Sequence, residues 1–142
     1  MSESPEQPAR LSTPAQAALV LLVEDDVIAR RMMCKVLKRD GFLVAEAGNG
    51  QEALAAYDQR PPDIVLLDIE MPVMDGYTTC RELRTRANTQ QLPVLMVSGN
   101  SDMASVNRAY DEGANDFITK PVSLDKLGLT LKKWLHTRKD SV

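Results

Sequence analysis

Five short stretches rich in apolar and β-branched residues recur along the chain, and a segment with helical periodicity follows each one. The stretches are Leu19–Val23, Phe42–Glu46, Ile64–Leu67, Pro93–Val97 and Asp116–Thr119. Runs of this length that end at Gly, Pro, Asn or Asp are typical of buried strands. Between them, apolar residues return every three or four positions, which predicts amphipathic helices.

Strict alternation of strands and helices predicts an α/β fold of the doubly wound type. The central strands are apolar on both faces, so a parallel sheet needs helices on both sides. We expect five strands, five helices and one domain over residues 18–138. Residues 1–17 lack apolar periodicity and are expected to be a disordered extension, and residues 139–142 form a C-terminal tail.

Composition narrows the class of protein. A chain of 142 residues with 44% apolar and 26% charged residues is typical of one soluble domain. The net charge of −3 gives no basic surface for nucleic acid. The apolar residues 17–23 are too few to span a membrane and lead into acids rather than a cleavage site. Cys34 and Cys80 lack paired spacing, so we expect free thiols and a cytoplasmic location.

Polar residues stand where four of the predicted strands end. They are Glu24, Asp25 and Asp26 after the first strand, Asp68 after the third, Ser98 after the fourth and Lys120 after the fifth. The carboxyl ends of parallel strands meet at one edge of a sheet, where open α/β folds bind ligands. Each residue alone could be an ordinary turn or surface residue, and Asp26 is expected to cap a helix. Together they predict one site.

The residue types in this site indicate its chemistry. Clustered carboxylates raise one another's pKa unless a cation lies among them. Oxygen ligands without His or Cys favour Mg²⁺ over zinc. A carboxylate beside Mg²⁺, with a lysine and a hydroxyl nearby, can accept a phosphoryl group.

The chain resembles the receiver domain of two-component response regulators over residues 18–138. The matching motifs are Val23-Glu24-Asp25, Leu67-Asp68-Ile69-Glu70-Met71-Pro72-Val73-Met74-Asp75-Gly76, Val97-Ser98-Gly99 and Phe117-Ile118-Thr119-Lys120-Pro121. The resemblance implies a flavodoxin-like fold with the strand order 2-1-3-4-5.

The resemblance also assigns the acceptor and the metal ligands. Asp68 would accept the phosphoryl group from a partner histidine kinase or histidine phosphotransfer protein. Asp25, Asp68 and the backbone carbonyl of Glu70 would bind Mg²⁺, and Glu24 would assist through water.

Three further residues would couple phosphorylation to a change in shape. By the resemblance, the hydroxyl of Ser98 moves toward the phosphoryl group and Lys120 pairs with it. Phe117 is the switch aromatic, which turns inward as Ser98 moves. The peptide bond between Lys120 and Pro121 is expected to be cis.

One position departs from the family pattern. Glu70 lies two residues after the acceptor, with its side chain directed toward the phosphoryl site, where its charge could repel phosphate or position water. Asn100, two residues after Ser98, is the second expected tuning position. We therefore expect Glu70 and Asn100 to set the lifetime of the phosphorylated state.

The resemblance implies a signalling switch rather than an enzyme. Output would pass through the face formed by residues 102–112, 116–119 and 123–138, which would change binding to a downstream protein or drive homodimerisation. Two other classes remain open: a hydrolase of the haloacid dehalogenase type, and an interaction module that needs no phosphorylation. The sequence also leaves open whether the receiver stands alone or belongs to a longer protein.

Overall fold

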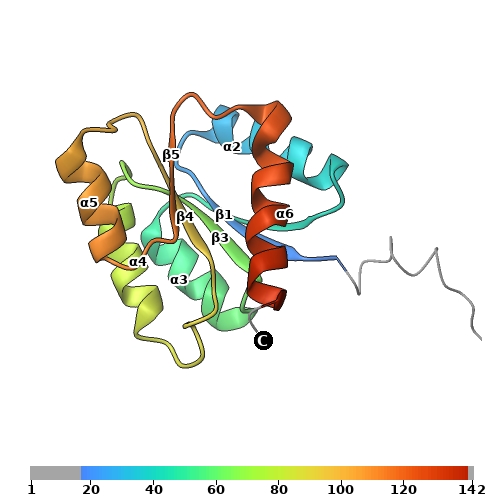
Figure 1. Ribbon diagram of the computed structural model, residues 1–142. Helices are drawn as coiled ribbons and strands as arrows, with labels where there is room; N and C mark the ends of the chain where they lie inside the picture. The colour runs from blue at the N-terminus through green and yellow to red at the C-terminus, as the bar shows by residue number, and fades with distance from the viewer. Residues whose placement is uncertain (1–16, 141–142) are drawn as a thin grey trace, which may run out of the picture.

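The computed structural model describes residues 17–140, and these form a five-stranded parallel sheet between two layers of helices (Figure 1). The strands are β1 (Leu19–Val23), β2 (Leu43–Ala47), β3 (Ile64–Asp68), β4 (Val94–Ser98) and β5 (Asp116–Thr119). The helices are α2 (Val27–Arg39), α3 (Gly50–Gln59), α4 (Gly76–Arg84), α5 (Met103–Asp111) and α6 (Leu124–Asp140). The sheet order is β2-β1-β3-β4-β5, with every neighbouring pair parallel, so the predicted fold and strand order are confirmed.

Alternate residues of each strand enter separate apolar cores on the two faces of the sheet. Val20 and Leu22 of β1 pack with α2 and α6, whereas Leu21 and Val23 pack with α3, α4 and α5. Helices α2 and α6 accordingly cover one face, and α3, α4 and α5 cover the other (Figure 1). The two cores hold the strand ends in fixed positions along one edge.

Short capping loops connect that edge to the helices. Asp26 accepts hydrogen bonds from the backbone of Ile28 and Ala29, which confirms its expected capping role. Three other helices begin in the same way, on Asn49, Asp75 and Asp102. A side-chain oxygen at this position satisfies backbone N–H groups that have no partner inside the helix.

Strand β2 runs from Leu43 to Ala47, one residue later at each end than predicted. Phe42 belongs instead to the turn that ends α2, because its N–H donates to the carbonyl of Leu37. Gly41, with φ of +98°, donates to Lys38 in the same turn. This pair of bonds is a Schellman cap, which needs a left-handed residue at the glycine position.

The structure describes residues 17–140, so most of the predicted N-terminal extension is not described. The extension expected at residues 1–17 lies, apart from Ala17, outside the described residues, as do the last two residues of the expected tail. Within the part of the chain that the structure describes, no helix is long and apolar enough to cross a membrane.

Candidate functional site

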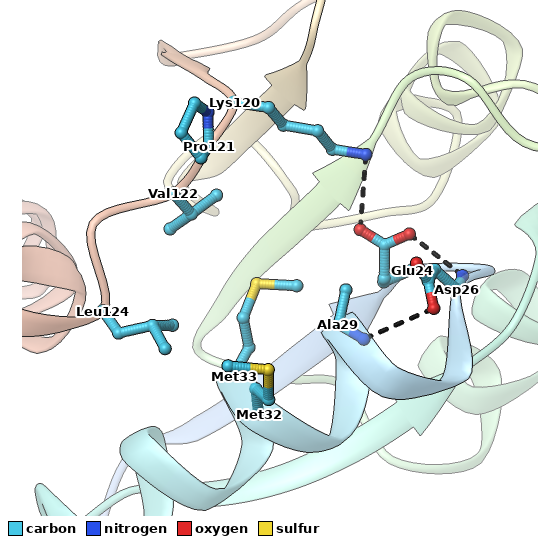
Figure 2. A pocket seen from close by; sticks show the side chains of 9 residues that line it. All are labelled: Glu24, Asp26, Ala29, Met32, Met33, Lys120, Pro121, Val122 and Leu124. Atoms are coloured by element: carbon cyan, nitrogen blue, oxygen red, sulfur yellow. Dashed lines mark hydrogen bonds and ion pairs between the residues drawn. The ribbon is translucent and has the colours of Figure 1, made fainter.

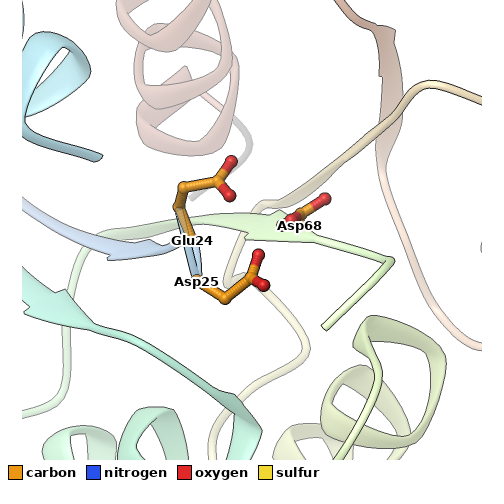
Figure 3. A group of neighbouring side chains, drawn as sticks. All are labelled: Glu24, Asp25 and Asp68. Atoms are coloured by element: carbon orange, nitrogen blue, oxygen red, sulfur yellow. The ribbon is translucent and has the colours of Figure 1, made fainter. Parts of the chain in front are cut away.

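Three carboxylates meet where β1 and β3 end. Glu24, Asp25 and Asp68 each place an oxygen within 4.8 Å of the others (Figure 3). Glu24 is 2% exposed and Asp68 is 1% exposed, whereas Asp25 faces solvent. The strand register explains this meeting. Val23 of β1 lies beside Leu67 of β3, and an acid follows each of these two residues.

Lys120 supplies the positive charge of the site from the end of β5. Its Nζ lies 3.1 Å from Oδ1 of Asp68. The same atom lies 3.5 Å from Oε1 of Glu24, an ion pair that Figure 2 shows. Its backbone N–H donates to the carbonyl of Ser98, which ties it to the end of β4. The peptide bond to Pro121 is cis, as expected.

Asp68 holds a carboxyl group that is poorly stabilised in its charged form. Burial first, and then the negative charge of Glu24, raise its pKa to about 7, although Lys120 acts in the opposite direction. Burial lowers the pKa of Lys120, but the Asp68 and Glu24 carboxylates more than offset this, so the net shift is upward. Among the described residues, neither Asp68 oxygen has a hydrogen bond of good geometry, although the Lys120 ammonium group lies within ion-pair distance of Oδ1.

These features fit a hard divalent cation. The two buried oxygens of Asp68 have no hydrogen bond, and they belong to a cluster of three carboxylates and one ammonium group. A cation with oxygen ligands would satisfy those oxygens and offset the excess negative charge. The donor set contains only oxygens, which matches the preference of Mg²⁺.

Ser98 contributes the hydroxyl of the site, and Glu70 contacts it directly. Oγ of Ser98 lies 2.5 Å from Oε2 of Glu70 and accepts a hydrogen bond of 2.9 Å from the N–H of Asn100. The N–H of Gly99 makes a longer contact, 3.4 Å, with the other Glu70 oxygen. The side chain of Glu70 therefore lies against the Ser98 hydroxyl at the end of β4.

Phe117 lies on β5, one strand beyond Ser98. It is half-buried and packs against the core beneath α3, α4 and α5. The preceding residue, Asp116, accepts a hydrogen bond of 2.9 Å from the indole of Trp134 on α6. Any movement of β5 should therefore alter the surroundings of the tryptophan.

Two residues that support the site were not predicted to do so. A Cβ on Gly76 would lie 2.5 Å from the backbone oxygen of Asp68, so only glycine fits against this residue. Arg30 donates to the carbonyl of Glu24 at 2.7 Å and to Glu46 at 3.2 Å. From the sequence, Gly76 stands out only as the last residue of a matching motif, and no motif includes Arg30.

An apolar groove opens beside the charged residues. The charged residues Glu24, Asp26 and Lys120 line one part of it. The rest is formed by Ala29, Met32, Met33, Pro121, Val122 and Leu124 (Figure 2). Its volume is about 480 Å³. Met32 is 51% exposed at this groove, so apolar surface reaches the rim of the site.

Residues 20–132 match the response regulator receiver domain family, and the chain belongs to this family. Members are phosphorylation-dependent signalling switches rather than conventional enzymes, which sets aside the haloacid dehalogenase alternative.

Relatives and solved structures agree with this assignment. The chemotaxis protein CheY of Bacillus subtilis is 36% identical over 118 residues, covering 82% of this chain and 97% of that protein. The transcriptional regulatory protein CseB of Streptomyces avermitilis is 38% identical over 126 residues, or 86% of this chain and 52% of that protein. The chain thus spans about half the length of the transcriptional regulators that it matches.

Solved structures show the same fold. A putative response regulator from Chloroflexus aurantiacus superposes with a TM-score of 0.79 at 32% identity, over 84% of this chain and 98% of that chain. A CheY-like receiver domain from Methanospirillum hungatei gives a TM-score of 0.83 at 23% identity, over 89% of this chain and 99% of that chain. At this identity the similarity is one of fold alone.

Proposed function

We propose that this chain is a switch in which Asp68 accepts a phosphoryl group from a phosphohistidine on a partner histidine kinase or histidine phosphotransfer protein. One observation carries the proposal. In a chain of the receiver family, Asp68 is a buried carboxylate whose two oxygens lack hydrogen-bond partners among the described residues, while an ammonium group lies 3.1 Å away. Such a carboxylate is held ready for a charged ligand.

The transfer is a displacement at phosphorus. An oxygen of Asp68 forms the new P–O bond as the P–N bond to the donor imidazole breaks, and the released ring nitrogen takes up a proton. Lys120 neutralises charge on the transferring oxygens. Asp25, Asp68 and the carbonyl of Glu70 would hold Mg²⁺, with Glu24 assisting through water, and the ion supplies positive charge to the phosphoryl oxygens.

The phosphodonor must bring its histidine to the rim of the site. Met32 lies at that rim, in the groove that also contains Glu24 and Lys120. Exposed apolar side chains favour contact with a protein surface. A donor protein would therefore cover Met32, whereas a small donor such as acetyl phosphate would not need to.

Output follows from the movement of two residues. Ser98 would turn toward the phosphoryl group and Phe117 would turn inward behind it. The face of α5, β5 and α6 would then change its binding to a downstream protein or to a second copy. Large apolar side chains are exposed on this face at Met103, Tyr110 and Leu129, which supports a protein partner rather than nucleic acid.

Glu70 and Asn100 are the proposed determinants of phosphate lifetime. Both side chains are exposed beside the buried Ser98, so they border the space through which water would reach the phosphoryl group. The proposed role is a stoichiometric switch whose phosphate lifetime these two residues set, not turnover of a substrate.

The test is phosphorylation by acetyl phosphate with Mg²⁺, followed by intact-mass measurement. Wild-type protein should gain one phosphoryl group that is acid-stable and removed by hydroxylamine. Asp68→Asn should gain none, and omission of Mg²⁺ should abolish the adduct. Asp26→Asn is the matched control, because asparagine also caps helices well and the carboxylate lies outside the cluster.

Two outcomes would contradict the proposal. Rapid multiple-turnover release of phosphate from varied esters would indicate a hydrolase. Absence of any adduct, together with unchanged Trp134 fluorescence, would indicate an interaction module that needs no phosphorylation.

A further inference from the structure

The hydroxyl of Ser98 donates its only proton to Glu70. We propose that Glu70 is a positioning residue that holds Ser98 away from Asp68, so that the phosphoryl group must compete with the Glu70 carboxylate before the switch can occur. The inference rests on the proposed function and assigns Glu70 a role in the conformational equilibrium, separate from any effect on phosphate lifetime.

Distances identify Glu70 as the acceptor of that proton. Two oxygens lie within reach of Ser98 Oγ, at 2.5 Å for Glu70 Oε2 and 3.2 Å for the carbonyl of Asn100. A hydroxyl has one proton to donate. The shorter contact is to a carboxylate and has the length of a charge-assisted hydrogen bond, so Glu70 is the stronger acceptor.

The bond to Glu70 and a bond to a phosphoryl oxygen exclude each other. The fully buried Ser98 hydroxyl has a single proton, so it can donate to only one of these two acceptors at a time. Glu70 is exposed, so its carboxylate can return to solvent when Ser98 leaves. The contact is therefore reversible, and it stabilises the unphosphorylated arrangement.

Release of Ser98 would also reach α5. The N–H of Asn100 donates to Ser98 Oγ, and Oδ1 of Asn100 accepts from the N–H of Asp102. Asp102 in turn caps α5 by accepting from Ser105 at 2.7 Å. Ser98 is thus joined through Asn100 to the start of a helix on the proposed output face.

A rival explanation is that Glu70 acts only by repelling the negative charge of the phosphoryl group. The two explanations differ in their dependence on Ser98. Repulsion persists when the hydroxyl is removed, whereas competition for the proton disappears. A double-mutant comparison therefore separates them.

The experiment titrates beryllofluoride, a phosphoryl mimic, at saturating Mg²⁺ into wild type, Glu70→Ala, Glu70→Gln, Ser98→Ala and the Glu70→Ala/Ser98→Ala double variant. Bound beryllofluoride is followed by ¹⁹F NMR, and the change in shape by the fluorescence of Trp134, the single tryptophan. Glu70→Ala should lower the half-saturating concentration about tenfold, because one hydrogen bond to a charged group is lost from the unbound state. Glu70→Gln keeps a hydrogen-bond acceptor but no charge, so its half-saturating concentration should lie between those of Glu70→Ala and the wild type.

In the Ser98→Ala background, removal of Glu70 should leave the half-saturating concentration unchanged. Asp125→Ala removes an exposed acid from the start of α6 and controls for net charge. If Glu70→Ala lowered the half-saturating beryllofluoride concentration equally in the wild-type and the Ser98→Ala backgrounds, repulsion would be the explanation and the inference would be overturned. If neither the wild type nor any variant binds beryllofluoride or forms the acetyl phosphate adduct, the proposed function fails and this inference fails with it.

Discussion

The ammonium group of Lys120 lies 3.1 Å from Asp68 and also contacts Glu24, so one cation faces two buried carboxylates. Asp25 adds a third carboxylate to the same cluster. The single positive charge of Lys120 therefore does not balance the negative charges of the three carboxylates. Burial is the larger cause of the raised pKa of Asp68, and the excess of negative charge adds to it. The same excess explains why the site fits a divalent cation.

The raised pKa makes the stability of the metal-free protein depend on pH. Asp68 titrates near pH 7 in the folded state and near pH 4 when unfolded, so the folded state holds the extra proton between these values. The free energy of unfolding should fall as pH rises from about 4 to 7 and then level off. Asp68→Asn should remove this dependence and be more stable than wild type at pH 8 by about 2–4 kcal/mol. Urea denaturation in EDTA at pH 4, 6 and 8 measures the difference.

Mg²⁺ provides the complementary measurement. At pH 8 it should raise the free energy of unfolding of the wild type, because a bound cation compensates the ionised carboxylates. The same addition should have little effect on Asp25→Asn, which lacks one proposed ligand, while Asp26→Asn should respond like wild type. Equal stabilisation of all three proteins would place the cation elsewhere.

Gly76 provides a steric test of how the backbone of Asp68 is held. An alanine there would bring Cβ to 2.5 Å from the Asp68 oxygen and 2.7 Å from Cα of Ile69, both backbone atoms that cannot rotate away. Gly76→Ala should cost about 2 kcal/mol or more of unfolding free energy and slow phosphorylation by acetyl phosphate. Gly99→Ala is the control, since a Cβ at Gly99 meets nothing within 4 Å. Equal stability of the two variants would mean that the backbone around Asp68 yields easily.

The sequence predicted the features that follow from parallel strand geometry. Because strand ends share one edge of the sheet, Glu24, Asp25, Asp68 and Lys120 could be expected together without knowledge of loop shapes. The capping role of Asp26 was equally predictable, since it depends only on the residues that follow it.

Features that depend on loops and side-chain rotation could not be predicted in the same way. The bond between Glu70 and Ser98 joins the loop after β3 to the last residue of β4, and its partners are decided by rotamers. The close approach of Gly76 to Asp68 depends on the path of the chain between them. The start of β2 was misplaced because the Schellman turn includes Phe42, whose apolar side chain also suits a strand.

Val73, in the same loop after β3, has an unfavourable backbone conformation. Its φ is +73° and its side chain is 70% exposed, so little burial offsets the cost. The left-handed region costs an L-residue roughly 1–2 kcal/mol, and β-branched side chains are especially rare there. Val73→Asn should raise the free energy of unfolding by about 1 kcal/mol, because asparagine adopts this region readily. Val73→Thr keeps the branched Cβ, so its free energy of unfolding should not rise. A rise in both variants would indicate an effect of polarity rather than of backbone conformation.

Met32 tests whether the groove beside the site receives the phosphodonor protein. Met32→Gln reduces apolar surface at the rim without touching the charged residues, which lie elsewhere on the lining. Phosphotransfer from a phosphorylated histidine phosphotransfer protein should slow about fivefold, the effect of losing roughly 1 kcal/mol of contact energy. The rate with acetyl phosphate should stay unchanged, because a small donor makes no contact with the groove. Met103→Gln, an equally polar change at an exposed methionine of α5, should leave both rates at the wild-type value. A Met32→Gln protein that is slowed with both donors would show damage to the site itself, and one that is slowed with neither would place the docking surface elsewhere.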